Sequence, residues 1–298
     1  MGLETASEPK HSFFPRVTRQ KIGPYLLAGL LILRLPYLAV VGTLFNSPPA
    51  WLYFSFSIAT YLITALLIYV ERERLQAFWF DLVSGIIFLC QTYLFLGGIG
   101  LFATMRRKQA RFPAPPSGVL RWALLGGLLG VLAELMVLYL KLNPPQGRST
   151  ESATLGSLFF AVIIQMTNAA VLEEPLFRGF LWGYLRLAKW KNVWIWLFQA
   201  GLFTLGHVYY LRVEPFGPWF VRITIPALTL GLIAWGARSI AASMVTHGFF
   251  NATFDVLMHY GTPGQAVGIA WTAVIILGVI LGLVITWEIF RSKKRQVL

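Results

Sequence analysis

Long apolar runs, separated by short polar loops, recur along the whole chain. Most are about 20 residues or longer, the length that an α-helix needs to cross the hydrocarbon core of a bilayer. We therefore expect an all-α fold, a polytopic transmembrane helical bundle of eight or nine membrane-crossing helices. The expected spans are residues 24–45, 51–70, 80–104, 119–142, 153–172 continuing to about 187, 193–212, 219–237, 238–260 and 267–290.

Composition supports a membrane protein. Of the 298 residues, 57% are hydrophobic and 12% are charged, whereas a soluble domain carries about 25% charged residues. The chain has 25 Lys and Arg against 12 Asp and Glu, but they gather in short loops and tails and form no basic globular module, so we expect no nucleic-acid partner. The single cysteine, Cys90, excludes an intramolecular disulfide.

The distribution of basic residues predicts the orientation, because cytoplasmic loops are enriched in Lys and Arg. The loops 105–118 and 186–191 and the tail "RSKKRQVL" are basic, and the intervening loops are nearly free of positive charge. This alternation places the C-terminus in the cytoplasm. The N-terminal segment is also basic, yet three apolar runs separate it from the 105–118 loop, so its side stays open.

The loop "RRKQARFPAPPSG", Arg106 to Gly118, is basic and then proline-rich, which is typical of a linker. It divides the chain into two expected parts. Residues 1–118 hold the N-terminal tail, transmembrane helices and the basic loop. Residues 119–298 hold a transmembrane core that carries the chemistry described next.

Strongly polar side chains of the C-terminal spans lie at similar depth. At 1.5 Å per residue, Glu173, His207, His247 and Asn251 lie roughly 20, 21, 14 and 20 Å from the cytoplasmic edge. Each alone is compatible with an interhelical hydrogen bond or a structural ion pair. Together, a carboxylate, two imidazoles and an amide provide a base, a proton donor and donors for an oxyanion, so we expect one shared buried site.

Helical spacing separates the two adjacent glutamates. Glu174 and Arg178 are four residues apart and can pair on one face, whereas Glu173 points about 100° away. Pro175 disfavours helical geometry at Glu174 and removes a backbone donor, which predicts a kink or break at the glutamates. In the later span, His247 and Asn251 share a face, and Asp255 and His259 continue that row.

Three motifs lie in order on separate spans: E-E-x-x-x-R at Glu173–Arg178, F-x-x-x-H at Phe203–His207 and H-x-x-x-N at His247–Asn251. With them, residues 150–260 resemble the CPBP family of CAAX proteases and bacteriocin-processing enzymes, also called the Abi family, and are similar to type II CAAX prenyl endopeptidases. The resemblance marks residues 119–298 as a CPBP-like transmembrane catalytic core. It implies a multi-pass protein of a bacterial or archaeal cell membrane.

The resemblance also implies an activity, that of an intramembrane endopeptidase with a cytosol-facing cavity. Glu173 would activate a water with help from His207, while His247 and Asn251 would stabilise the oxyanion. Glu174 and Arg178 are expected to give structural support. The expected partners are the lipid bilayer and a hydrophobic or lipidated, CAAX-like peptide or protein, whose binding residues the sequence does not identify.

Three alternatives stay open at this point. The family is often labelled metalloprotease, and Glu173, His207 and His247 would be the ligands of a zinc ion. The H-E-x-x-H arrangement is absent, so we expect no metal or other cofactor. Buried Glu, His, Asp and Arg residues are also the parts of a proton-coupled membrane transporter. A catalytically silent bacteriocin-immunity protein would keep the same fold.

Overall fold

A computed structural model describes residues 22–32, 50–96, 112–141, 150–212 and 214–296, and these residues form helices and loops without a strand. The all-α prediction is therefore confirmed for this part of the chain. The first described helix spans Ile22–Ile32. It is followed by α2 (Ala50–Glu71), η1 (Leu75–Phe78), α3 (Leu82–Leu96), α5 (Val119–Tyr139), α6 (Leu155–Gln165), η2 (Met166–Ala170), α7 (Val171–Glu174), η3 (Pro175–Leu181), α8 (Trp182–Leu187), α9 (Asn192–Leu205), η4 (Val208–Arg212), α10 (Phe216–Ala237), α11 (Ile240–His259) and α12 (Pro263–Gln296).

The predicted count of eight or nine crossings is not confirmed. Within the described residues, four helical stretches are long and apolar enough to cross a membrane: Val119–Tyr139, Leu155–Leu187, Phe216–Ala237 and Pro263–Ser292. Of the remaining apolar helices, α2 covers its expected span of residues 51–70. α9 ends at Leu205 instead of continuing to 212, and α11, which is long enough, carries polar residues of the site. Residues 33–45 of the first expected span, 97–104 of the third and 105–111 of the basic loop lie outside the described residues.

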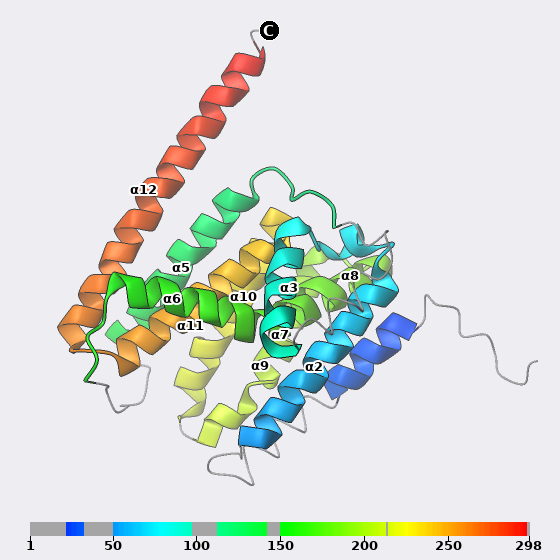
Figure 1. Cartoon of the computed structure of the whole chain (residues 1–298), viewed down its shortest axis with the longest axis horizontal. Helices are drawn as coiled ribbons and strands as arrows, with labels where there is room; N and C mark the ends of the chain where they lie inside the picture. Colours follow the sequence, from blue (N-terminus) through cyan, green and yellow to red (C-terminus); the bar gives the residue numbers. More distant parts are fainter. Residues whose placement is uncertain (1–21, 33–49, 97–111, 142–149, 213, 297–298) are drawn as a thin grey trace, which may run out of the picture.

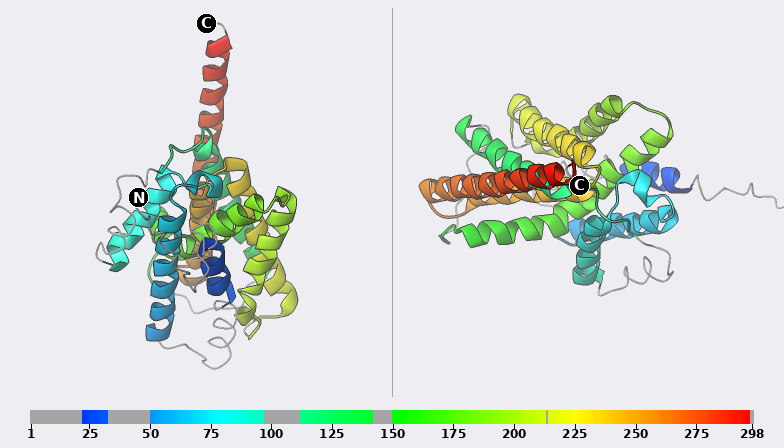
Figure 2. Two further views of the ribbon diagram at one scale, coloured as in Figure 1. Left: turned by 90° about the vertical axis from the view of Figure 1, so that its right-hand side faces the viewer. Right: turned by 90° about the horizontal axis from the view of Figure 1, so that it is seen from above.

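Among the helices that the structure describes, α12 is the longest, and it projects beyond the bundle toward the C-terminus (Figures 1 and 2). Its 34 residues give a length of about 50 Å, which exceeds the roughly 30 Å of a hydrocarbon core. Its base packs against α5 and α11, and Arg121 of α5 forms an ion pair of 2.8 Å with Glu288 of α12. The helix is therefore longer than a perpendicular crossing of this layer requires.

The span that carries both glutamates runs from Leu155 to Leu187 as one stretch. Of the predicted kink or break at the glutamates, the break is therefore wrong, and the kink stays a prediction. The backbone at Glu174, Pro175 and Trp182 keeps right-handed helical angles. Two segments instead have wider π-helical turns, η2 before the glutamates and η3 from Pro175 onward. Pro175 stands at the start of η3, where the altered hydrogen-bond register tolerates its missing N–H, and such π segments are frequent at functional sites.

Close packing of α11 against α5 and α6 depends on glycine. A Cβ atom on Gly126 of α5 would lie 1.8 Å from Thr246 Oγ1, and one on Gly248 of α11 would lie 2.9 Å from the carbonyl oxygen of Val162 in α6. Gly130 likewise faces the backbone of α11. Small residues let helices approach closely in membrane proteins, and here they bring the polar residues of three helices within reach of one another.

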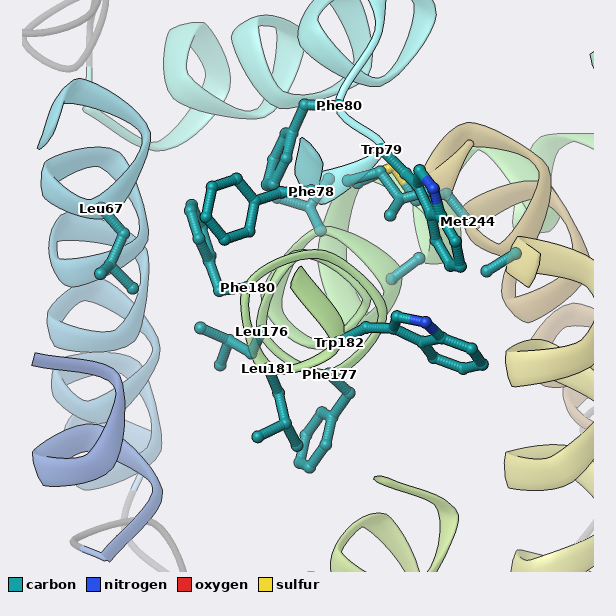
Figure 3. Close-up of a cluster of buried hydrophobic side chains, with 14 of the residues drawn as sticks. Leu67, Phe78, Trp79, Phe80, Leu176, Phe177, Phe180, Leu181, Trp182 and Met244 are labelled. Atoms are coloured by element: carbon teal, nitrogen blue, oxygen red, sulfur yellow. The ribbon is translucent and has the colours of Figure 1, made fainter. Parts of the chain in front are cut away.

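A cluster of buried aromatic side chains fixes the glutamate-bearing span against the N-terminal helices (Figure 3). Phe78 and Phe80, from the segment between α2 and α3, pack on Phe180, with ring centroids 5.7 and 4.9 Å apart. On the other side of the span, Trp182 packs on Trp79 at 5.0 Å. This core holds the helix that carries the glutamates, and it joins residues on both sides of the predicted boundary at 118. The functional division at that boundary stays a prediction.

Candidate active site

Glu174 and Arg178 form a buried ion pair beside Glu173. Arg178 Nη1 lies 3.0 Å from Glu174 Oε1, and neither side chain is exposed, as the four-residue spacing predicts. Arg178 also donates from Nη2 to the carbonyl oxygen of Ala227 in α10 at 3.1 Å. Its guanidinium lies over the ring of Phe203 at 4.5 Å. The pair therefore connects the glutamate-bearing span to α9 and α10.

Glu174 makes a second contact that joins it to α11. Its Oε1 atom lies 2.8 Å from Nδ1 of His247. Because an ionised carboxylate only accepts hydrogen bonds, Nδ1 of His247 carries the proton in this contact. Glu174 thus receives hydrogen bonds from a guanidinium and an imidazole at once, and it orients the imidazole so that Nε2 points elsewhere.

Glu173 faces the two imidazoles that the sequence analysis assigned to the site. Its Oε2 atom lies 3.9 Å from Nε2 of His247, and its Oε1 atom lies 4.0 Å from Nε2 of His207. The side chain is 12% exposed, in contrast to its buried neighbour Glu174. These distances exceed a direct hydrogen bond and match the span that one bridging water covers. The two adjacent glutamates therefore have different surroundings.

His207 stands just after the end of α9. The helix ends at Leu205 with Gly206 as its C-cap, and Nδ1 of His207 lies 2.8 Å from the carbonyl oxygen of Phe203. A carbonyl only accepts, so Nδ1 donates and Nε2 is directed toward Glu173. The ring of Phe203 stacks on His207 at 4.5 Å. The F-x-x-x-H spacing thus provides both the backbone acceptor and the ring that orient this histidine.

Asn251 lies one turn beyond His247 on α11 and belongs to a chain of side-chain amides and carboxylates. Its Nδ2 atom donates to Gln165 Oε1 at 3.3 Å. Gln165, the last residue of α6, donates in turn from Nε2 to Asp255 Oδ2 at 2.8 Å. This chain leaves the Asn251 carboxamide at the wall of the cavity in a fixed orientation.

All four residues that were predicted to be catalytic line one cavity of about 360 Å³. Glu173 and His207 border it together with His247 and Asn251 of α11. The similar depths calculated from the sequence thus correspond to a common location in the fold. Their chemical roles stay predictions.

The cavity also holds polar residues that the sequence analysis did not single out. Glu134 of α5, Gln165 of α6 and Arg222 of α10 line it. Glu134 is the only acidic residue within the run 119–142, and an ionisable residue inside a span is by itself a signal of function. Gln165 gives a weaker signal, as a single amide between apolar residues. Asp255 had been noted only as part of the row on α11, and it too borders the cavity.

The side chains of Glu173, His207 and His247 are the candidate ligands for zinc. Within the described ranges, no group of three or more His, Cys, Asp or Glu residues is arranged to hold a metal ion. The Nδ1 atoms of His207 and His247 are engaged with Phe203 and Glu174, so only their Nε2 atoms face the cavity. Metal dependence is therefore a matter for measurement.

Comparison with known proteins connects this site to a family. Among curated proteins and solved structures, none matches the chain. The model of one protein family, described as type II CAAX prenyl endopeptidase Rce1-like, matches residues 155–253. The matched segment begins at α6, ends within α11 and contains the three motifs. Residues 155–253 are therefore similar to the Rce1-like domain of type II CAAX prenyl endopeptidases.

Proposed function

We propose that the protein is an intramembrane endopeptidase that hydrolyses a peptide bond with a water activated by Glu173. The observation that carries the proposal is the position of Glu173. Its two carboxylate oxygens face Nε2 of His207 and of His247 at 4.0 and 3.9 Å at the wall of a cavity. Its neighbour Glu174 is occupied by Arg178 and His247 and is not available as the base.

In the proposed reaction, a water held between Glu173 and the imidazoles gives a proton to Glu173 and attacks the carbonyl carbon of the scissile peptide bond. The C=O π electrons move to the oxygen and form an oxyanion. When the tetrahedral intermediate collapses, the C–N bond breaks, and the nitrogen takes a proton from Glu173 and leaves as an amine. The products are a carboxylic acid and an amine, and Glu173 is ionised again.

The oxyanion requires donors that are in place before it forms. Asn251 provides an amide N–H, and its orientation is fixed by Gln165. His247 provides a second donor at Nε2 when its ring is protonated, because Nδ1 is already bonded to Glu174. His207 lies on the other side of Glu173 and assists the transfer of the water proton.

The proposed substrate is a hydrophobic or lipidated peptide, CAAX-like in its general chemistry, which is cleaved near the cytoplasmic face. The apolar helices around the cavity and the Rce1-like family support a substrate that reaches the site from the membrane. Purified protein in detergent, supplied with CAAX-like and membrane-anchored reporter peptides, is expected to cleave at least one of them. Glu173→Ala, assayed beside it, should be inactive.

Asn251→Ala is expected to lower kcat by about 10²–10³-fold, the usual effect of removing one oxyanion donor. The amide acts in the transition state in this mechanism, so KM should change little. The kinetic constants of the purified variant on the best reporter peptide measure both effects. Gln165 retains its bond to Asp255 in this variant. Normal turnover with raised KM would reassign Asn251 to substrate recognition.

Peptidase activity is expected to survive removal of divalent metal ions, because the proposed base and donors are side chains. The test is elemental analysis of active protein, followed by prolonged dialysis against EDTA and a new rate measurement. A control sample, dialysed without chelator, corrects for loss of activity with time. Stoichiometric zinc, whose removal abolishes activity and whose return restores it, would contradict the prediction.

A further inference from the structure

A second acidic region lies in the cavity, apart from the glutamate–histidine cluster, and begins at Glu134 of α5. Glu134 follows Gly126 and Gly130 at four-residue intervals, so it continues the face of α5 that packs on α11. The residue is only 6% exposed and borders the cavity. Its Oε2 atom has no hydrogen-bond partner among the residues that the structure describes. A buried carboxylate oxygen without a donor is costly.

Arg222, a cation that also lines the cavity, is already engaged. Its Nε atom donates to Glu214 Oε2 at 3.2 Å, its Nη2 atom donates to Glu214 Oε1, and its guanidinium lies over the ring of Tyr210 at 4.8 Å. Arg222 is within electrostatic range of Glu134, but its charge is balanced by Glu214. One guanidinium therefore faces two carboxylates, those of Glu214 and Glu134.

Asp255 adds a further carboxylate to the same region. It interacts electrostatically with Glu134, accepts a hydrogen bond from the neutral Gln165 at 2.8 Å, and has His259 one helical turn away at the end of α11. Glu134, Glu214 and Asp255 therefore face one guanidinium and one imidazole. The region has an excess of acceptors and of negative charge, which favours a cationic ligand over an anionic one.

The distance between this region and the reacting groups determines which residue of a bound peptide can reach it. His247 and Asp255 are eight residues apart on α11, which corresponds to about 12 Å along the helix. An extended peptide advances about 3.3–3.6 Å per residue. A side chain that reaches the acidic region thus belongs to a residue three or four positions from the scissile bond.

We propose that Glu134 and Asp255 form a specificity subsite for a basic side chain, Lys or Arg, of the peptide substrate, an inference that rests on the proposed peptidase function. The ammonium or guanidinium group donates to Glu134 Oε2, the atom without a partner, and balances the charge of the two carboxylates. The subsite selects peptides with a basic residue three or four positions from the cleaved bond. It takes no part in the chemical step.

A scan of reporter peptides tests the subsite. Peptides that differ only by Lys, norleucine or Glu at one position, within four residues on either side of the scissile bond, are compared by kcat/KM. At the position that reaches the subsite, Lys is expected to be preferred to norleucine by about tenfold, and Glu to be disfavoured. In Glu134→Gln and in Asp255→Asn, the Lys-to-norleucine ratio should fall toward one. The matched control is Glu73→Gln, whose side chain is 77% exposed and does not line the cavity, and it should keep the ratio.

Two results would overturn the proposal: no position that prefers Lys, or a preference that both Glu134→Gln and Asp255→Asn leave unchanged. If no peptide is cleaved at all, the proposed function is contradicted. A binding measurement then tests the subsite without cleavage. Fluorescence anisotropy would compare labelled Lys and norleucine peptides on the intact protein and on Glu134→Gln. Tighter binding of the Lys peptide that depends on Glu134 supports the subsite. Equal or absent binding of the two peptides contradicts it.

Discussion

Glu173→Gln is expected to give a folded, thermally stable protein with almost no peptidase turnover. The substitution preserves the shape of the side chain and removes the carboxylate that accepts the water proton. General base catalysis contributes typically about 10²–10⁴-fold, so kcat should fall by at least this factor. The residue is partly exposed to the cavity and its imidazole contacts are 3.9 and 4.0 Å long, so its loss should cost little stability. A cleavage rate and a melting curve in detergent measure both effects.

Glu73→Gln is the matched control, since it makes the same chemical change at an exposed glutamate. It should keep both turnover and melting temperature. A destabilised Glu173→Gln beside a stable but inactive Glu174→Gln would reverse the roles of the two residues. If both variants cleave normally, the site is not a glutamate-dependent peptidase site, and the proton-coupled transporter gains support.

The helices could be predicted from the sequence because each long apolar run has to satisfy its backbone polar groups internally. The boundaries of α2, α5, α10 and α11 lie within about three residues of the expected ones. The number of membrane-crossing helices was harder to predict, because an apolar run does not show where a helix ends. At the end of α9, Gly206 and the bond from His207 to the carbonyl of Phe203 stop the helix, and these local interactions are invisible in a hydropathy pattern.

Within the site, contacts inside one helix were predictable and contacts between helices were not. The pair Glu174–Arg178 follows from their spacing. The bond from His247 to Glu174 joins residues 73 positions apart and depends on how α11 packs against the glutamate-bearing span. Similarly, Pro175 indicated a departure from α-helical geometry, but the sequence did not show that the helix would absorb it as a π segment. Glu134 was visible as a charge inside an apolar run, yet only the packing of α5 on α11 shows that it borders the cavity.

Glu174→Gln and Arg178→Ala are expected to lose stability and activity together. Both side chains are fully buried and paired at 3.0 Å, and removing one member of a buried ion pair typically costs about 3–5 kcal/mol, because the other charge is left uncompensated. Arg178→Ala also removes the bond to the carbonyl of Ala227 and the contact with the Phe203 ring. Glu174→Gln weakens the acceptor that orients His247. Melting curves in detergent, expression yields and cleavage rates of the two variants provide the test.

The double variant Glu174→Gln/Arg178→Met distinguishes two causes of lost stability: one buried charge left without its partner, and the absence of the ion pair itself. It removes both charges and keeps most of the side-chain volume, so the melting temperature should recover part of the loss seen in each single variant. Activity should not recover, because His247 still lacks its carboxylate partner at Nδ1. Recovery of both properties would show that Glu174 acts only through Arg178. If the single variants melt like the unchanged protein, the pair contributes no net stability. The proposed structural role of Glu174 would then be contradicted.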